Sequence, residues 1–222
     1  MALLLPSTRS LRRLSMPRID LYHRAACRHL RDGDPIMRTL IDRVGQCELV
    51  ARRGAFAILC HSIISQQLSI AAAATIYGRF VRLYPTRRLT PASVLASPVA
   101  SLRAVGLSEQ KVRYVLDLAF AFQNGLVQPR RFSKQSNEEI IATLMRIKGI
   151  GRWTVEMFLI FSLNRLDVLP VDDLGIRQSA QRWYGLPMPP SPAILRTLAE
   201  PWHPYESIAC WYLWRARRLP ER

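Results

Sequence analysis

Apolar residues recur at helical spacing along most of this chain, and this pattern constrains the fold more than any other feature. The clearest run places five residues on one helix face: Phe56, Leu59, Cys60, Ile63 and Ile64. Residues 112–120, 140–147 and 205–218 show the same spacing, and no segment alternates convincingly as a strand would. The pattern therefore predicts an all-α protein of about ten helices with short loops, broken by proline and glycine.

Three of the predicted helices carry a further signature. Ser136 and Glu139 precede the run of 140–147 with the spacing of a capping box, which marks a helix start. The helix over 157–163 is apolar on nearly every side, so we expect it to be buried all round. The pattern that begins at Phe56 runs into the helix-favouring stretch 71–74.

We divide the chain into an N-terminal arm and two helical subdomains. Residues 1–19 are basic and contain no acid, as in an organellar transit peptide. We interpret them as a disordered arm, or as an artefact of a gene start placed upstream of Met16. Residues 20–55 plus 174–222 form one discontinuous subdomain, and 56–173 form the central one.

The formal net charge is +16, from 32 lysines and arginines against 16 acidic residues. Such a surplus favours a polyanionic partner, because each neutralised phosphate releases a condensed counterion. All but three of the cations are arginine, a bias that genome composition can cause, so a generally basic solvated surface is the alternative. No run of about 18 apolar residues occurs, and we expect no membrane span.

The cysteines form neither a CxxC pair nor a tight cluster. Cys60 lies in an apolar run and Cys210 among aromatic residues, which is typical of buried free thiols. We therefore expect a reducing compartment. His23, Cys27 and His29 have a spacing that metal ligands use, but no second half-site accompanies them.

A glycine turn between two predicted helices is the strongest candidate for DNA contact. One helix ends near Ile147, and a second helix starts at about Arg152. Between them, Gly149 and Gly151 allow a tight turn with positive φ. The N–H groups of its first turn and the helix dipole can hold a phosphate, to which Lys148 and Arg152 add Coulomb attraction. The alternative is an ordinary glycine turn between core helices.

Two adjacent carboxylates, Asp172 and Asp173, follow an apolar run and open another predicted helix. We expect one of them to cap that helix. The functional interpretation is a buried or half-buried carboxylate that faces the DNA.

The turn and the carboxylates together resemble a known family. The sequence IKGIGRWT of 147–154, followed by LPVDD of 169–173, is similar to the helix–hairpin–helix DNA glycosylases of the DNA-3-methyladenine glycosylase II branch. The resemblance covers roughly residues 35–218 and indicates the compact form, without the N-terminal mixed-sheet domain of some members. It implies two helical subdomains with a DNA-binding cleft between them, Asp173 as the catalytic carboxylate, and phosphate binding by 148–152, including Ile150.

The same resemblance assigns further roles. Gln67 and Leu68 match a loop that wedges an apolar side chain into the gap left by an extruded base, although Leu68 could instead be a core leucine. Trp214 matches the aromatic residue that stacks on that base, with core packing as the alternative. Trp153 and Met157 complete the base pocket; some relatives have tyrosine at the position of Met157, so the base preference is open.

The resemblance also bears on cofactors. Trp153 occupies the position of the Schiff-base lysine of bifunctional relatives, so no lyase step is expected. Only Cys210 follows Asp173, whereas the iron–sulfur relatives have four closely spaced cysteines there, so no cluster is expected. A structural Na⁺ or K⁺ at the hairpin would be held by main-chain carbonyls of Met145, Ile147 and Ile150; no other cofactor is expected.

These observations predict a monofunctional DNA glycosylase that removes alkylated bases, such as 3-methyladenine and 7-methylguanine, in base excision repair and leaves an abasic site. The expected partner is double-stranded DNA with damaged bases, bound by a monomer, in the cytoplasm or nucleoid of a bacterium or the nucleus of a eukaryote. The alternatives are a non-catalytic helix–hairpin–helix DNA-binding protein and a glycosylase for oxidised or mismatched bases.

Overall fold

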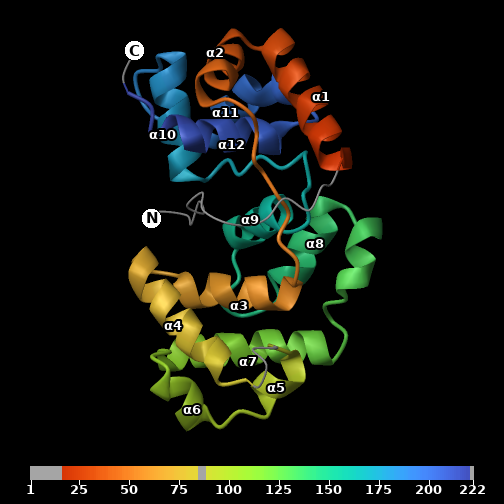
Figure 1. Cartoon of the computed structure of the whole chain (residues 1–222), viewed down its shortest axis with the longest axis vertical. Helices are drawn as coiled ribbons and strands as arrows, with labels where there is room; N and C mark the ends of the chain where they lie inside the picture. Colours follow the sequence, from red (N-terminus) through yellow and green to blue (C-terminus); the bar gives the residue numbers. More distant parts are fainter. Residues whose placement is uncertain (1–16, 85–88, 221–222) are drawn as a thin grey trace. The chain divides into compact units, whose positions relative to one another are not determined.

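Helices make up all the regular secondary structure of residues 17–84 and 89–220, which this computed structural model describes. Twelve α-helices, α1–α12, follow one another in these residues together with short 3₁₀ turns, and no strand occurs among them (Figure 1). The prediction of an all-α protein is confirmed. No helix in the described ranges is both long and apolar enough to cross a membrane.

The described residues form two compact units, and the second unit is assembled from both ends of the chain. The first unit contains Arg52–Phe158, and the second combines 17–51 with 159–220. We predicted that the chain returns to the discontinuous subdomain after residue 173, whereas in the structure it does so after Phe158.

The earlier return is explained by hydrogen bonds from the segment 159–173 to the C-terminal helix. The Ser207 N–H donates to the Leu166 carbonyl at 2.9 Å, and the Val168 N–H donates to Ser207 Oγ at 3.1 Å. At the end of the segment, Asp173 accepts a hydrogen bond from Trp214. These bonds join residues about 40 positions apart, which a local sequence pattern does not reveal.

The first unit is built around α7. Its helices are α3 (Ala55–Ser65), α4 (Ile70–Arg82), α5 (Pro91–Leu95), α6 (Val99–Ala104), α7 (Glu109–Gln123), α8 (Asn137–Leu144) and most of α9 (Arg152–Phe161). Helix α7 packs against α3 and α5, and Val112 and Val115 are buried as predicted. Phe120, the last residue of the predicted apolar run 112–120, is 59% exposed, and Leu118 takes the buried position instead. The predicted helix over 157–163 is the second half of α9: it is buried through residue 160 as expected, but α9 ends at Phe161 and residues 161–163 are half-buried.

The helical pattern that runs from Phe56 into 71–74 is divided between two helices. Helix α3 ends at Ser65, and α4 begins at Ile70 after Ser69, whose Oγ accepts a hydrogen bond from the Ala72 N–H at 3.3 Å. Gln67, between them, has φ +57° and so lies outside the right-handed helical region. The break produces a partly exposed loop, residues 66–69, which we call the wedge loop because the resemblance assigns that role to Gln67 and Leu68.

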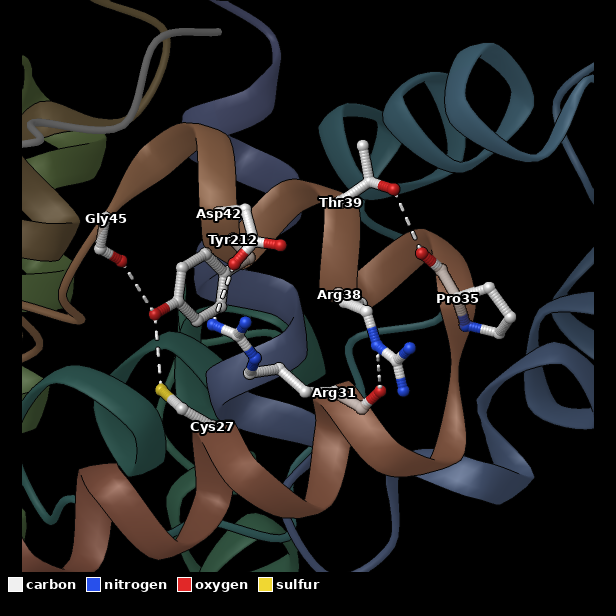
Figure 2. Close-up of polar contacts among 8 residues, drawn as sticks. All are labelled: Cys27, Arg31, Pro35, Arg38, Thr39, Asp42, Gly45 and Tyr212. Atoms are coloured by element: carbon white, nitrogen blue, oxygen red, sulfur yellow. Dashed lines mark hydrogen bonds and ion pairs between the residues drawn. The ribbon is translucent and has the colours of Figure 1, made fainter.

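The second unit is built around α12. Its helices are α1 (Pro17–Gly33), α2 (Pro35–Val44), α10 (Leu174–Tyr184), α11 (Pro192–Ala199) and α12 (Glu206–Ala216). Helix α12 is buried along most of its length and contacts α2 and α10. Figure 2 shows one of its anchors: the Tyr212 hydroxyl donates to the Gly45 carbonyl at 3.0 Å and lies 3.2 Å from Cys27 Sγ. The N-terminal and C-terminal helices therefore share one core.

Two further expectations can be compared with these coordinates. The predicted basic arm lies outside the described residues except for 17–19, which are helical because α1 begins at Pro17. Cys60 and Cys210 are buried free thiols, as predicted.

Candidate functional site

The predicted hairpin lies between α8 and α9 in the first unit. The capping box before α8 is confirmed: the Ser136 N–H donates to Glu139 Oε2 at 2.6 Å, and the Glu139 N–H donates to Ser136 Oγ at 3.2 Å. Helix α8 ends at Leu144, earlier than the expected end near Ile147, and α9 begins at Arg152 as expected. The connection over 145–151 is held down by two buried residues, Ile147 and Ile150.

Gly149 is the residue that makes this turn possible. Its φ is +83°, and a Cβ added there would overlap the ring of Tyr114 from α7. Its carbonyl accepts a hydrogen bond from Gln66 Nε2 at 2.8 Å. Any side chain at this position would therefore meet both backbone strain and a steric clash.

Gly151 has a different role from the one we predicted. It does not have a positive φ, because the chain has already reversed at Gly149. Gly151 leads into α9, and its carbonyl accepts a hydrogen bond from the Val155 N–H at 3.2 Å. A Cβ added at Gly151 would meet no atom within 4 Å. The glycine therefore leaves open space beside the first turn of α9, where a phosphate oxygen could approach the backbone.

The two predicted cations of the hairpin differ in their surroundings. Lys148 has an exposed side chain, and its N–H donates to Asp117 Oδ2 at 2.8 Å. Arg152 instead forms a bidentate pair with Glu138, at 2.9 and 2.7 Å, and lies 3.8 Å from Glu156. The hydrogen bond from Arg152 holds the pKa of Glu138 below its ordinary value. A phosphate at Arg152 must therefore compete with a carboxylate.

The wedge loop is attached directly to the hairpin by the Gln66–Gly149 hydrogen bond. Gln67, at its tip, is exposed and left-handed, a conformation that costs an L-residue about 1–2 kcal/mol. Leu68 is half-buried, and its N–H donates to the Ser65 carbonyl at 3.3 Å. Both predicted wedge residues therefore lie on a strained, partly exposed loop, although the sequence did not indicate that Gln66 tethers it.

Asp173 is a buried carboxylate in the second unit, with only 6% of its surface exposed. It is the N-cap of α10: its Oδ1 accepts from the Ile176 N–H at 2.8 Å and from Trp214 Nε1 at 3.0 Å. Asp172, its neighbour, is exposed. The capping role that we expected of one aspartate therefore belongs to Asp173, and two N–H donors hold its Oδ1 in place.

Trp214 supports this carboxylate from α12. Its indole is buried, its N–H is directed at Asp173, and its ring packs against Phe161 with centroids 5.4 Å apart. The absence of a side chain at Gly175 allows close packing here. A Cβ at Gly175 would lie 3.0 Å from Asp173 Oδ1 and 3.0 Å from Arg217 Nη1. The Arg217 guanidinium, which the sequence did not indicate as a site residue, therefore lies near the Asp173 carboxylate.

The other two residues predicted for the base pocket lie on α9 in the first unit. Trp153 is half-buried, and Met157, one turn later, is buried. The structure thus joins Asp173 to Trp214 and the wedge loop to the hairpin by direct hydrogen bonds. Base stacking by Trp153, Met157 and Trp214 stays a prediction. Within the described part of the chain, no group of three or more His, Cys, Asp or Glu side chains is arranged to hold a metal ion.

Comparisons with known proteins place the chain in a family. A family model described as HhH-GPD superfamily base excision DNA repair protein matches residues 60–204. The alkylbase DNA glycosidase-like protein mag2 of Schizosaccharomyces pombe is 32% identical over 209 residues, which cover 90% of this chain and 96% of that protein. DNA-3-methyladenine glycosylase 1 of the same yeast is 35% identical, with 87% of each chain covered.

A solved structure gives the same result. The S. pombe 3-methyladenine DNA glycosylase Mag1, in complex with abasic DNA, matches with a TM-score of 0.79 at 35% identity, covering 89% of this chain and 98% of that one. This match extends over both units of the chain. The resemblance drawn from the hairpin and Asp173 is confirmed: the chain belongs to the HhH-GPD superfamily of base excision DNA repair proteins.

Proposed function

We propose that this protein is a monofunctional DNA glycosylase that hydrolyses the N-glycosylic bond of alkylated bases such as 3-methyladenine and 7-methylguanine in duplex DNA. The observation that carries the proposal is the buried carboxylate of Asp173, held by the Ile176 N–H and the Trp214 indole. The relatives named as 3-methyladenine glycosylases support the same substrate class. Such an enzyme acts where genomic DNA is, in the bacterial nucleoid or the eukaryotic nucleus.

The chemistry of an alkylated base explains why one carboxylate suffices. A base alkylated at a ring nitrogen carries positive charge, so it leaves readily and needs little acid catalysis. The barrier lies in the oxocarbenium charge that develops on the sugar. A carboxylate that is fixed in place and shielded from water stabilises that charge and can orient or deprotonate the attacking water. The buried position and two N–H donors of Asp173 fit this role.

Hydrolysis without strand cleavage follows from the side chains near the hairpin. A lyase step requires an amine that forms an imine with the sugar. Trp153 supplies no amine, and no lysine lies between Gly149 and Asp173. The product should therefore be an intact strand with an abasic site.

We assign the base pocket to Trp153, Met157 and Trp214. Aromatic faces attract a cationic base by roughly 0.5–2 kcal/mol, which favours an alkylated base over a normal one. Trp214 would then serve twice, because its N–H already holds Asp173. The profile of bases that the protein releases from DNA tests this assignment, since equal release of normal and alkylated purines would contradict it.

DNA phosphates would be bound at the start of α9 by the N–H groups of Gly149 and Gly151 and the helix dipole, with Lys148 and Arg152 alongside. The Ile150 N–H, which we expected to take part, donates to the Ile147 carbonyl instead.

Main-chain carbonyls of Met145, Ile147 and Ile150 would hold Na⁺ or K⁺ beneath the turn. The Ile147 carbonyl accepts one hydrogen bond, from the Ile150 N–H at 3.2 Å, and so keeps a second lone pair for a cation. Replacing K⁺ by choline at constant ionic strength should weaken duplex binding; equal affinity in both salts would contradict the cation site.

Gly151→Ala should weaken binding to duplex DNA without harming the fold. The added methyl group meets no protein atom within 4 Å and requires no unusual φ, so the free energy of unfolding should change by less than about 1 kcal/mol. A phosphate that approaches the backbone would collide with it, and we expect Kd to rise at least about 10-fold, or 1.4 kcal/mol. Fluorescence anisotropy and thermal unfolding measure the two effects.

Gly78→Ala, in α4 of the same unit, is the matched control, because its added Cβ lies 3.7 Å from the nearest atom outside the helix backbone. It should leave Kd unchanged. If Gly151→Ala also binds DNA as tightly as the parent, the phosphate site lies elsewhere.

The proposed function is tested by incubating the purified chain with duplex DNA that carries radiolabelled methyl groups. Free 3-methyladenine or 7-methylguanine should appear by chromatography, and strands should break only after alkaline treatment. Binding without release of any base would favour a non-catalytic helix–hairpin–helix protein. Release only of oxidised or mismatched bases would contradict the alkylated substrate class.

A further inference from the structure

The ammonium group of Lys111 binds the end of α3. From the first turn of α7, Nζ donates to the Ile64 carbonyl at 2.6 Å and to the Gln66 carbonyl at 2.8 Å. These carbonyls lie at the C-terminal end of a helix, where the dipole favours a positive charge. Burial lowers the pKa of Lys111 below its ordinary value. Two of the three ammonium donors are thus directed at protein carbonyls, so we do not interpret Lys111 as a phosphate ligand.

Gln66 is consequently held on two sides. Its carbonyl accepts from Lys111, and its side-chain amide donates to the Gly149 carbonyl at 2.8 Å. These bonds link three elements of the first unit: α7, the wedge loop and the hairpin. The Gln66 carbonyl is also part of the peptide group that leads into Gln67, the left-handed residue of the loop. A non-glycine residue keeps this conformation only when its surroundings impose it.

We propose that Lys111 is a positioning residue for base extrusion. This proposal rests on the proposed glycosylase function. Lys111 and Gln66 hold the wedge loop in a fixed conformation before DNA binds. Gln67 and Leu68 can then enter the gap that an extruded base leaves in the duplex without first being ordered. A preformed loop loses less conformational entropy on binding than a mobile one, so more of its contact energy stabilises the extruded state. Lys111 acts through the loop and does not touch the reacting atoms.

The test compares a paired lesion with an unpaired one. Lys111→Met keeps the aliphatic stem and removes the ammonium donors. Under single-turnover conditions, it should excise 7-methylguanine paired with cytosine at least about 10-fold more slowly than the parent, because the loop must then be ordered on DNA. The same lesion in a one-nucleotide bulge, which is already unpaired, should be excised within about threefold of the parent rate.

Two controls isolate the positioning role. Lys134→Met removes the same charge from an exposed site in the same unit, and it should excise the paired lesion at the parent rate. Hydrogen–deuterium exchange of the peptide containing 66–69 should be faster in Lys111→Met than in the parent, with the rest of α7 unchanged. The exchange measurement requires no base release, so it tests whether Lys111 orders the wedge loop even if the proposed function is wrong.

The outcomes separate the two proposals. If the parent protein releases no alkylated base, the proposed function is wrong, and the exchange measurement alone decides whether Lys111 orders the loop. If the parent is active and Lys111→Met matches it on the paired lesion, the positioning role is wrong and the glycosylase function stands. Equal slowing of paired and bulged lesions would also overturn the positioning role, because it would indicate a general defect.

Discussion

Asp173→Asn should release 3-methyladenine from methylated duplex DNA at least about 100-fold more slowly than the parent protein. The neutral amide cannot stabilise the developing sugar cation as a carboxylate does. The asparagine oxygen can still accept from the Ile176 N–H and the Trp214 indole, so the cap of α10 and the fold should persist. Duplex affinity should remain within about threefold of the parent, since the N-terminal phosphate site of α9 is untouched.

Single-turnover base release and fluorescence anisotropy measure these two quantities. Asp172→Asn is the matched control: it removes the same charge from the exposed neighbouring position and should release base at the parent rate. Release by Asp173→Asn at the parent rate would show that another group supports the reaction and would remove the main argument for the proposed mechanism.

Gly149→Ala should destabilise the first unit and abolish DNA binding. The methyl group would overlap the Tyr114 ring and force a residue with a Cβ into φ +83°. Overpacking and left-handed strain together should lower the free energy of unfolding by about 2–4 kcal/mol. Chemical denaturation measures the change, and anisotropy with duplex DNA measures the loss of binding. The contrast with Gly151→Ala is direct, because the second substitution should affect binding alone.

A double-mutant cycle separates the two causes of that instability. Tyr114→Ala removes the ring that the new methyl group meets, so adding Gly149→Ala to it should cost less than adding it to the parent, by about 1–2 kcal/mol. The remaining cost reports the backbone strain. If the two substitutions prove additive, the Tyr114 contact does not explain why glycine is required at the turn.

The features that could be predicted from the sequence are those set by neighbouring residues. The capping box of Ser136 and Glu139 and the N-cap before α10 depend on side chains that bind backbone groups three positions away. The start of α9 at Arg152 follows directly from the glycine turn before it. The same local logic failed at 66–69, where a continuous apolar pattern concealed the end of one helix and the start of another. It also failed at Gly151, because a G-x-G pattern does not reveal which glycine makes the reversal.

By itself, therefore, the sequence determined an all-α fold, a glycine hairpin, and a carboxylate at the start of a helix; the family resemblance then linked the hairpin and the carboxylate to one activity. The tertiary structure decided what holds them: Trp214 reaches Asp173 across 41 residues, Gln66 reaches Gly149 across 83, and Lys111 reaches Ile64 across 47. Each of these bonds depends on how distant helices pack. Helical periodicity indicates which face of a helix is buried, but not which distant residue that face will meet.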